Sequence, residues 1–293
     1  MDIVLPKAGR YVLAVSGGVD SVVLLDILSR QGGLELVVAH FDHGIRADSA
    51  DDRRFVEKLA STYDLPYEYT EGRLGPKASE AAARKARYDF LGRLQKEQKA
   101  LAIITAHHQD DVLETAIINI LRGTGRKGLT ALRSREDVIR PLLKVPKSEL
   151  ITYAKDRDLR WHEDPTNADL SYLRNYVRHK LLTRFSSADR QQLVDILTKL
   201  TITNKELDSA IQDLLVRQPA GQLDRQWFNQ LPHAAAREVM AGWLRAGGAP
   251  GFDRKTLERL VVSAKAAPAG QTFPVQAGFY MCATVNHLAL VYN

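Results

Sequence analysis

Short apolar runs alternate with amphipathic segments through the first half of the chain. The apolar runs are bounded by glycine or polar residues, which is typical of buried strands, and the segments between them repeat apolar residues at helical spacing. Such an alternation predicts an α/β fold, with a parallel twisted sheet covered by helices on both faces. The predicted strands are Tyr11–Val15, Leu34–His40, Pro66–Thr70, Leu101–Ala106 and Val138–Arg140, and the predicted helices are Ser21–Ser29, Ala50–Tyr63, Ser79–Gln98 and Asp110–Leu121.

Beyond Val145 the alternation stops and helical patterns dominate, followed by short strand-like runs near the end of the chain. We therefore expect a catalytic α/β domain with a helical extension over residues 1–205 and a small α+β domain over residues 206–293. The expected helices are Pro146–Arg157, Leu173–Phe185, Ala188–Val216, Ala234–Arg245 and Arg254–Ala264, and the expected strands are Thr272–Val275, Phe279–Val285 and Leu288–Tyr292.

Composition excludes several classes of protein. The chain has 293 residues, of which 45% are hydrophobic and 26% charged, as expected of a globular protein. No stretch approaches the roughly 20 consecutive apolar residues of a membrane span, and the amino terminus lacks the pattern of a signal peptide, so we expect a cytoplasmic protein without a membrane partner. Cys282 is the only cysteine, which excludes an intramolecular disulfide and a thiolate-rich metal or iron–sulfur site.

The positive charge is concentrated in two segments. The formal net charge is +6, and the segment Arg122–Lys147 alone carries eight basic residues against two acidic ones. The segment Ser171–Leu200 carries six basic residues against two acidic ones. A solvated helix face is an alternative explanation for each segment, but two of them flanking candidate chemistry favour a nucleic-acid partner.

A glycine turn directly follows the first predicted strand, in the sequence Ser16-Gly-Gly-Val-Asp-Ser21. Two glycines allow a sharp turn whose N–H groups approach an anion, and the following helix adds its positive end, so this turn is a candidate phosphate site. It lacks the lysine of the ordinary NTPase loop. The carboxylate of Asp20 would repel a polyphosphate unless a cation lay between them, which implies Mg²⁺; an ordinary helix N-cap is the alternative. The candidate nucleotide-binding residues are Ser16, Gly17, Gly18, Val19, Asp20 and Ser21.

Acidic and histidine residues follow two other predicted strands. Asp110 and Glu114 are four residues apart and project from one helix face, with Asp111 beside them, so these acids could share Mg²⁺ or hold a cationic substrate. Acids favoured by the helix dipole are the alternative. In His40-Phe-Asp-His43, Asp42 and a neighbouring histidine are candidates to orient a substrate or act as a base, whereas the spacing of the histidines argues against zinc. The candidate catalytic residues are Asp20, Asp42 and Asp110.

Two pairs of arginines are candidates to contact phosphate or RNA. Arg122 and Arg126 lie in a glycine-bearing basic loop, where a plain surface turn is the alternative. Arg174 and Arg178 are one helical turn apart, where a solvated helix face is the alternative.

In order and spacing, these motifs resemble the tRNA(Ile)-lysidine synthetase family of the N-type ATP pyrophosphatases, also called the PP-loop superfamily. The resemblance covers roughly Tyr11 to Arg178 and includes SGGVDS, HFDHGIRADS, AHHQDDVLET, LRGTGRKGL, RPLL, WHEDPTN and RNYVR. It departs at Val112, where the family more often has Gln, and at Pro165-Thr166, where serines are more common. The chain ends near residue 293 and resembles the shorter members, which have one appended domain.

The resemblance implies an activity. ATP would adenylate the 2-carbonyl oxygen of the wobble cytidine in tRNA(Ile) with a CAU anticodon, and the ε-amine of free L-lysine would then displace AMP. Asp111 and Glu114 are the implied lysine contacts, ATP and Mg²⁺ the implied cosubstrate and metal, and the small C-terminal domain is expected to bind tRNA. The pattern leaves open whether the chain forms a homodimer.

Three alternatives remain at this point. A base-thiolating relative would use cysteines for sulfur handling, and this chain has only Cys282, far from the motifs. An amide-forming synthetase for a small carboxylate would need no basic flanks. A nucleotide-regulated RNA-binding module would bind ATP and tRNA without releasing pyrophosphate.

Overall fold

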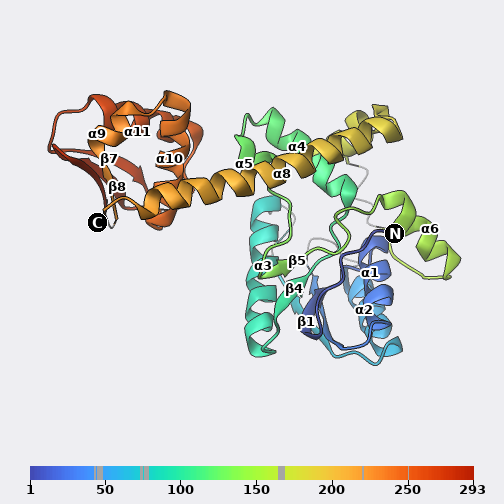
Figure 1. Ribbon diagram of the computed structural model, residues 1–293. Coiled ribbons are helices and arrows are strands. Elements are labelled where there is room, and N and C mark those ends of the chain that lie inside the picture. The colour runs from blue at the N-terminus through green and yellow to red at the C-terminus, as the bar shows by residue number, and fades with distance from the viewer. Residues whose placement is uncertain are drawn as a thin grey trace. The chain divides into compact units, whose positions relative to one another are not determined.

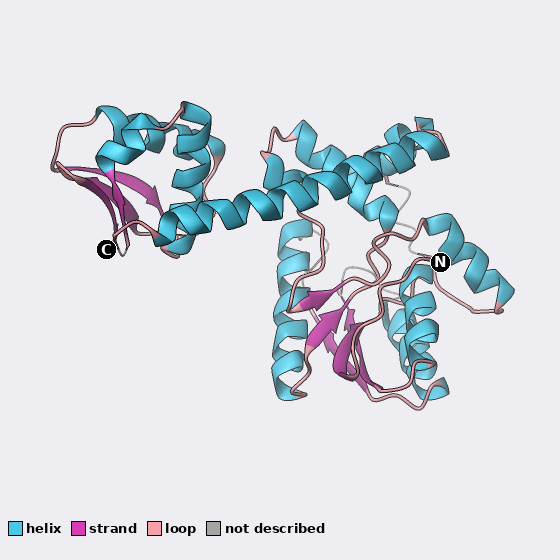
Figure 2. Ribbon diagram, viewed as in Figure 1, coloured by secondary structure: helices cyan, strands magenta, loops and turns pink. Residues whose placement is uncertain are grey.

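A five-stranded parallel sheet forms the centre of the first part of the chain (Figures 1 and 2). The order is β3-β2-β1-β4-β5, so the connections change direction between β1 and β4. That point, at the carboxyl ends of the strands, is where ligands bind in open α/β sheets. The prediction of a parallel α/β sheet is confirmed, with the strands at β1 (Gly9–Ala14), β2 (Leu34–Asp42), β3 (Tyr67–Glu71), β4 (Ala102–Ile104) and β5 (Val138–Ile139).

Helices cover both faces of this sheet because successive strand residues point to opposite sides. Leu13 belongs to a core with α1 (Val19–Ser29), α2 (Ser49–Thr62) and α6 (Lys147–Asp156). Its neighbour Val12 belongs to a second core with α3 (Glu80–Glu97). Figure 1 shows α3 on the opposite side of the sheet from α1 and α2. The alternation of buried residues along each strand therefore fixes which helix covers which face.

The structure describes residues 1–42, 44, 49–72, 75, 79–163, 169–219, 221–249 and 251–293. The chain divides into two compact units, the first formed by Met1–Arg122 and Leu129–Asp195 and the second by Gly123–Gly128 and Ile196–Asn293. The division falls within the long helix α8 (Ser187–Val216), on which the predicted boundary at 205/206 also lies.

Helix α4 (Gln109–Leu121) follows β4 and packs against a segment that departs from the predicted regular helix 173–185. That segment has one α-helical turn, α7 (Leu173–Tyr176), then a π-helical turn, η2 (Val177–Leu181), and a 3₁₀ turn, η3 (Leu182–Arg184). The widened π turn changes the angular spacing between successive side chains, and such turns are frequent at functional sites.

The second unit has an antiparallel sheet of order β6-β9-β8-β7 packed against helices. Its core is built around buried Phe228, Met240 and Leu260, together with Met281 and Leu288 of the sheet. The predicted helices and last three strands are present, whereas α5, β6 and α9 are short and were not predicted. The elements are α5 (Arg126–Leu129), β6 (Gln222–Asp224), α9 (Arg225–Gln230), α10 (His233–Ala246), α11 (Arg254–Ala266), β7 (Gln271–Gln276), β8 (Phe279–Ala283) and β9 (His287–Tyr292).

Across the described ranges, no helix combines the length and the apolar character that a membrane span needs.

Candidate active site

The glycine turn after β1 is held in shape by its own serines. Gly17 has φ of 92°, a left-handed conformation that side chains rarely adopt, and Gly18 is the N-cap of α1. The hydroxyl of Ser21 accepts from the N–H of Ser16 at 3.2 Å and donates to the carbonyl of Gly18 at 2.9 Å. The turn's own hydroxyl and backbone groups therefore hold its shape, with the N-terminus of α1 at its end.

Asp20 connects the first turn of α1 to two other elements. One oxygen, Oδ2, lies 3.2 Å from Nζ of Lys147 at the start of α6 and 3.5 Å from Nε2 of His108 after β4. Burial opposes ionisation of Asp20, but His108 and Lys147 outweigh it and lower its pKa. The loops that follow β1 and β4 thus meet at the point where the sheet order changes direction. Lys147 was not among the predicted residues, because 127 positions separate it from Asp20.

The other carboxylate oxygen of Asp20 is a candidate ligand for the expected Mg²⁺. Oδ1 is buried and has no hydrogen-bond partner in the part of the chain that the structure describes. Buried carboxylate oxygens are normally paired, so this atom has the chemistry of a cation ligand. Within the described ranges no three His, Cys, Asp or Glu side chains group into a metal site. Since Mg²⁺ is commonly held by one or two carboxylates plus substrate phosphates, the residues present fit a nucleotide-bound Mg²⁺.

The start of α4 places two histidines and a carboxylate together. The Asp111 carboxylate accepts from the backbone N–H of His108 at 3.0 Å and lies 3.6 Å from its Nε2. Burial opposes both charges, but His108 and His107 lower the pKa of Asp111, while Asp20 and Asp111 raise the pKa of His108. His107, hydrogen-bonded to Thr105 at 2.8 Å, has its pKa lowered to about 3 by burial and by nearby arginines. The loop after β4 therefore holds an imidazole whose pKa is lowered next to one whose pKa is raised.

Glu114 is fully buried and paired with two arginines. Arg174 Nε lies 3.1 Å from Oε2, and Arg178 binds the carboxylate through Nε and through Nη2, the latter at 3.0 Å from Oε2. Arg178 Nη2 also lies 3.5 Å from Asp111. The structure thus joins Asp111, Glu114, Arg174 and Arg178 into one mixed-charge cluster.

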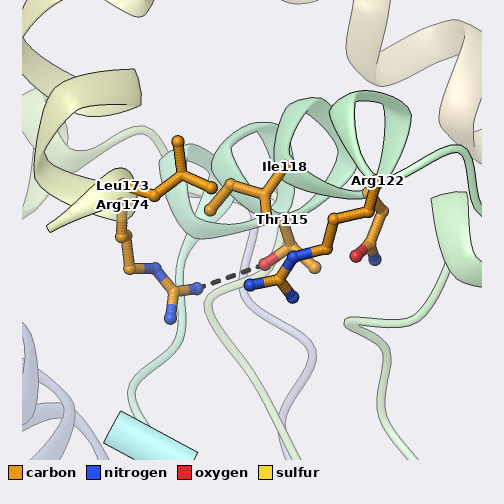
Figure 3. A pocket seen from close by; sticks show the side chains of 6 residues that line it. Thr115, Ile118, Arg122, Leu173 and Arg174 are labelled. Carbon is orange, nitrogen blue, oxygen red and sulfur yellow. Dashed lines mark hydrogen bonds between the residues drawn. The ribbon is translucent and has the colours of Figure 1, made fainter. Parts of the chain in front are cut away.

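A small pocket adjoins this cluster between α4 and α7 (Figure 3). Its volume is about 120 Å³. Figure 3 shows Arg122 and Arg174 reaching toward Thr115 from two elements, and Arg174 donates to the Thr115 hydroxyl at 3.2 Å. The pocket is lined by Thr115, Ile118, Asn119, Arg122, Leu173 and Arg174.

The remaining predicted acids lie in different surroundings. Asp110 contacts Arg190 at 3.3 Å and accepts from the backbone N–H of Lys147 at 3.4 Å. Lys147 is also the residue whose side chain contacts Asp20, so Asp110 lies near Asp20. The partners of Asp110 differ from those of Glu114. Asp42 is buried at the end of β2 and accepts from the N–H of Gly44 at 2.8 Å. The described contacts include no bond between Asp42 and Asp20. His43 and the Pro165-Thr166 pair lie outside the described residues.

Arg126 belongs to the second unit and is enclosed by acids. Its guanidinium donates to Asn204 at 2.7 Å, to Asp208 at 2.9 Å and to Glu238 at 2.9 Å. These bonds connect the start of α5 to α8 and α10. Arg126 therefore belongs to a different unit from Arg122, Arg174 and Arg178, and its acidic partners are different from the Glu114 that pairs with Arg174 and Arg178.

A segment after α6 crosses the glycine turn and was not predicted to do so. The backbone N–H of His162 donates to the carbonyl of Gly17 at 3.0 Å. The His162 ring stacks on Phe55, with centroids 4.3 Å apart, and its Nδ1 lies 2.7 Å from Asp52 of α2. His162 thereby joins the glycine turn to α2.

We expect His162→Ala to raise the KM for ATP about fivefold while changing kcat little, because a stacked aromatic pair contributes about 1 kcal/mol. Steady-state kinetics with varied ATP would measure this. The matched control is His233→Ala, which removes another histidine–carboxylate pair, with Glu258 in the second unit. Equal KM values for the two variants would contradict a positioning role for His162.

The fold and the glycine turn define a class: an α/β protein with a glycine turn at the switch point of its parallel sheet. The family comparison agrees, since the model of the PP-loop domain matches residues 3–185. The chain belongs to the PP-loop family.

Similar proteins confirm the resemblance to tRNA(Ile)-lysidine synthetases that the motifs predict. The chain is 39% identical over 279 residues to a tRNA(Ile)-lysidine synthase of Deinococcus radiodurans, covering 91% of this chain and 45% of that protein. It is 45% identical over 175 residues to one of Thermus thermophilus, covering 57% of this chain and 34% of that protein. The chain thus spans less than half the length of these two relatives.

Among solved structures, the U34-tRNA thiolase NcsA from Methanococcus maripaludis, described with its 4Fe-4S cluster, has a similar fold. The TM-score is 0.53 at 19% identity, over 67% of this chain and 74% of that chain. This likeness supports the fold alone.

Proposed function

We propose that this chain is an ATP-dependent carbon–nitrogen ligase that makes lysidine in tRNA(Ile) with a CAU anticodon. It would adenylate the 2-carbonyl of the wobble cytidine, releasing pyrophosphate, and then join L-lysine, releasing AMP, so that the codon read changes from Met to Ile. The observation that carries the proposal is the buried, unpaired Asp20 oxygen where the loops after β1 and β4 meet. The identity to tRNA(Ile)-lysidine synthases supports this choice of substrate.

The nucleotide would bind at the glycine turn. Its backbone N–H groups and the Ser16 and Ser21 hydroxyls would hold the phosphates, with Gly17, Gly18 and Val19 in close approach. Asp20 would hold Mg²⁺, which when bound would neutralise phosphate charge. Lys147, 3.2 Å from Asp20, is a cation already in place to face the same phosphates.

Lysine would bind in the mixed-charge cluster. Asp111 and Glu114 carry the negative charge that an ammonium group needs, and Arg178 between them offers positive charge for a carboxylate. The free ε-amine has an ordinary pKa of about 10.4, so it must lose a proton before it attacks. We assign that proton transfer to a carboxylate, with Asp110 beside Asp20 and Asp42 at the end of β2 as the candidates.

The tRNA would approach across the basic segments, with Arg122, Arg174 and Arg178 contacting phosphate at the first unit. The second unit would supply further contacts. There Arg126 would act chiefly by anchoring the start of α5, since its guanidinium is bound by Asp208 and Glu238. The reaction would take place in the cytoplasm, where tRNA, ATP and lysine meet.

One assay tests the proposal. The protein is incubated with ATP, Mg²⁺, labelled lysine and bulk tRNA, and we expect label in RNA together with AMP and pyrophosphate. Labelled RNA should depend on a tRNA(Ile) whose position 34 is C, and a transcript with U34 is the matched control. The proposal fails if lysine is not incorporated with the correct tRNA, or if ATP is consumed at the same rate without tRNA.

A further inference from the structure

Three arginines surround one tyrosine on the side of the sheet covered by α3. The guanidinium carbon of Arg84 lies 4.9 Å from the centroid of the Tyr88 ring, and that of Arg87 lies 5.5 Å from it. Arg140, which follows β5, donates from Nη2 to the Tyr88 hydroxyl at 3.3 Å. A helix and an edge strand therefore bring three positive charges to one aromatic side chain. None of this was predicted, although Arg84 and Arg87 are three residues apart and so share a helix face.

The two arginines of α3 have no acidic partner among the side chains that the structure describes. In the described ranges, neither Arg84 nor Arg87 has an ion-pair partner. Burial lowers the pKa of Arg87, and the charges of Arg84, Arg174 and Arg140 lower it further. Arg84 is exposed and Arg87 half-buried. Like charges held close together destabilise the folded chain, and an anion bound between them would remove that cost.

Arg140 gives an independent sign that a ligand belongs here. Its side chain is only 6% exposed, and burial lowers its pKa. Nη1 donates to the carbonyl of Arg133 and Nη2 to Tyr88, while Nε is buried with no hydrogen-bond partner among the described residues. Buried donors are almost always paired, so one acceptor is missing from this group.

The arginine cluster borders the candidate active site. Burial has the largest effect on the pKa of His107, in the loop after β4, and lowers it. Of the nearby charges, Asp111 raises this pKa, and the three arginines of the cluster lower it further. The glycine turn, by contrast, follows β1 and has its own N–H groups and hydroxyls for phosphate. The nucleotide's phosphates thus have a separate place, and the arginine cluster suits another anion near the reacting base.

We propose that Arg84, Arg87 and Arg140 form a binding site for a phosphoryl oxyanion, supplied by the RNA backbone close to the base that reacts. Guanidinium groups bind phosphate through paired hydrogen bonds and keep their charge when partly desolvated, which suits them to this role. The assignment to RNA rests on the proposed function. The same chemistry could instead hold pyrophosphate or ATP, and the experiment below separates these sources.

The test compares the double variant Arg84→Gln/Arg87→Gln with Arg93→Gln/Lys96→Gln, which removes two exposed charges from the same helix. Binding of bulk tRNA is measured over a series of salt concentrations, independently of lysine incorporation. We expect the first variant to lose at least about tenfold in affinity and to flatten the salt dependence by about one phosphate contact. The control should lose about twofold or less, and ATP affinity should stay the same in both.

A second measurement separates binding from a structural role. Removing unbalanced positive charge should raise the melting temperature of Arg84→Gln/Arg87→Gln at low salt, whereas a structural role would lower it. Inorganic phosphate should raise the melting temperature of the wild type more than that of this variant.

The outcomes are distinct. Wild-type affinity of the double variant for tRNA, pyrophosphate and ATP alike would overturn the site, whereas loss of pyrophosphate or ATP affinity with intact tRNA affinity would overturn only its assignment to RNA. A wild type that binds no tRNA would count against the proposed function and the RNA source together. In that case, if phosphate raised the melting temperatures of wild type and variant equally, the anion site would be ruled out as well.

Discussion

Asp20→Asn should lower pyrophosphate release by at least about a hundredfold while leaving the fold intact. The substitution keeps the shape of the side chain but removes the charge that a cation bridging to phosphate requires, and losses of that order follow removal of one charge-stabilising group. The measurements are pyrophosphate release with varied Mg²⁺ and ATP, and circular dichroism to verify the fold. The pKa of His108 should fall as well, because Asp20 is one of the two carboxylates that raise it.

The matched control for this variant is Asp89→Asn, which removes an exposed carboxylate paired with Lys85 on α3. That variant should release pyrophosphate at the wild-type rate. If Asp20→Asn were equally active with an unchanged dependence on Mg²⁺, Asp20 would not be the metal ligand and its buried oxygen would need another explanation.

The fold could be predicted because its signals are local. The strands of the first unit are short runs of two to nine residues, and the helices between them repeat apolar residues at helical spacing, so periodicity located them to within about two residues. Elements such as α9 escaped prediction because six residues carry too little periodicity. Its start is nevertheless visible in retrospect, since Asp224 caps it by accepting from the N–H of Trp227 at 2.8 Å.

The site was predictable only where its residues follow strands. SGGVDS and AHHQDD each come directly after a strand, and the parallel sheet brings those ends together, as the contact of Asp20 with His108 shows. Lys147 and His162 reach the same turn from distant positions, and no sequence spacing indicates this. The partners of Arg126 and Glu114 were likewise hidden, because a sequence shows the charge of a residue but not which opposite charge its fold supplies.

Asp26 lies on the same helix as Asp20, but we expect it to matter for stability and not for catalysis. Asp26→Ala should lower the free energy of unfolding and leave the reaction rate unchanged. Asp26 is fully buried and accepts from Arg30 at 2.7 Å, from the Tyr63 hydroxyl at 2.7 Å and from the Tyr153 hydroxyl at 2.7 Å. It thus ties α1 to the end of α2 and to α6. Breaking a buried, hydrogen-bonded pair costs about 3 kcal/mol, so the free energy of unfolding of the first unit should fall by about that amount.

Urea unfolding measures this loss, and hydrogen exchange locates it. Amides of α1, α2 and α6 should lose protection, while those of β7, β8 and β9 in the second unit should not. Asp26→Asn, which keeps one acceptor oxygen, should lose less than Asp26→Ala. Pyrophosphate release well below the unfolding transition should remain near the wild-type rate in both variants, since Asp26 has no contact in the candidate site among the described residues.

The acid dependence of this stabilisation has a defined sign. Burial disfavours the charged form of Asp26, but Arg30 and the two tyrosines outweigh it, so its folded pKa lies below the ordinary value of about 3.9. A carboxylate with a lowered pKa stabilises the fold fully above its unfolded pKa, and this contribution disappears as pH falls through the folded value. The difference in unfolding free energy between wild type and Asp26→Ala should therefore be constant from neutral pH to about pH 5 and narrow below about pH 4. A difference that stayed the same into that acid range would mean that shape and neutral hydrogen bonds, rather than the charge of Asp26, hold α1 to α2 and α6.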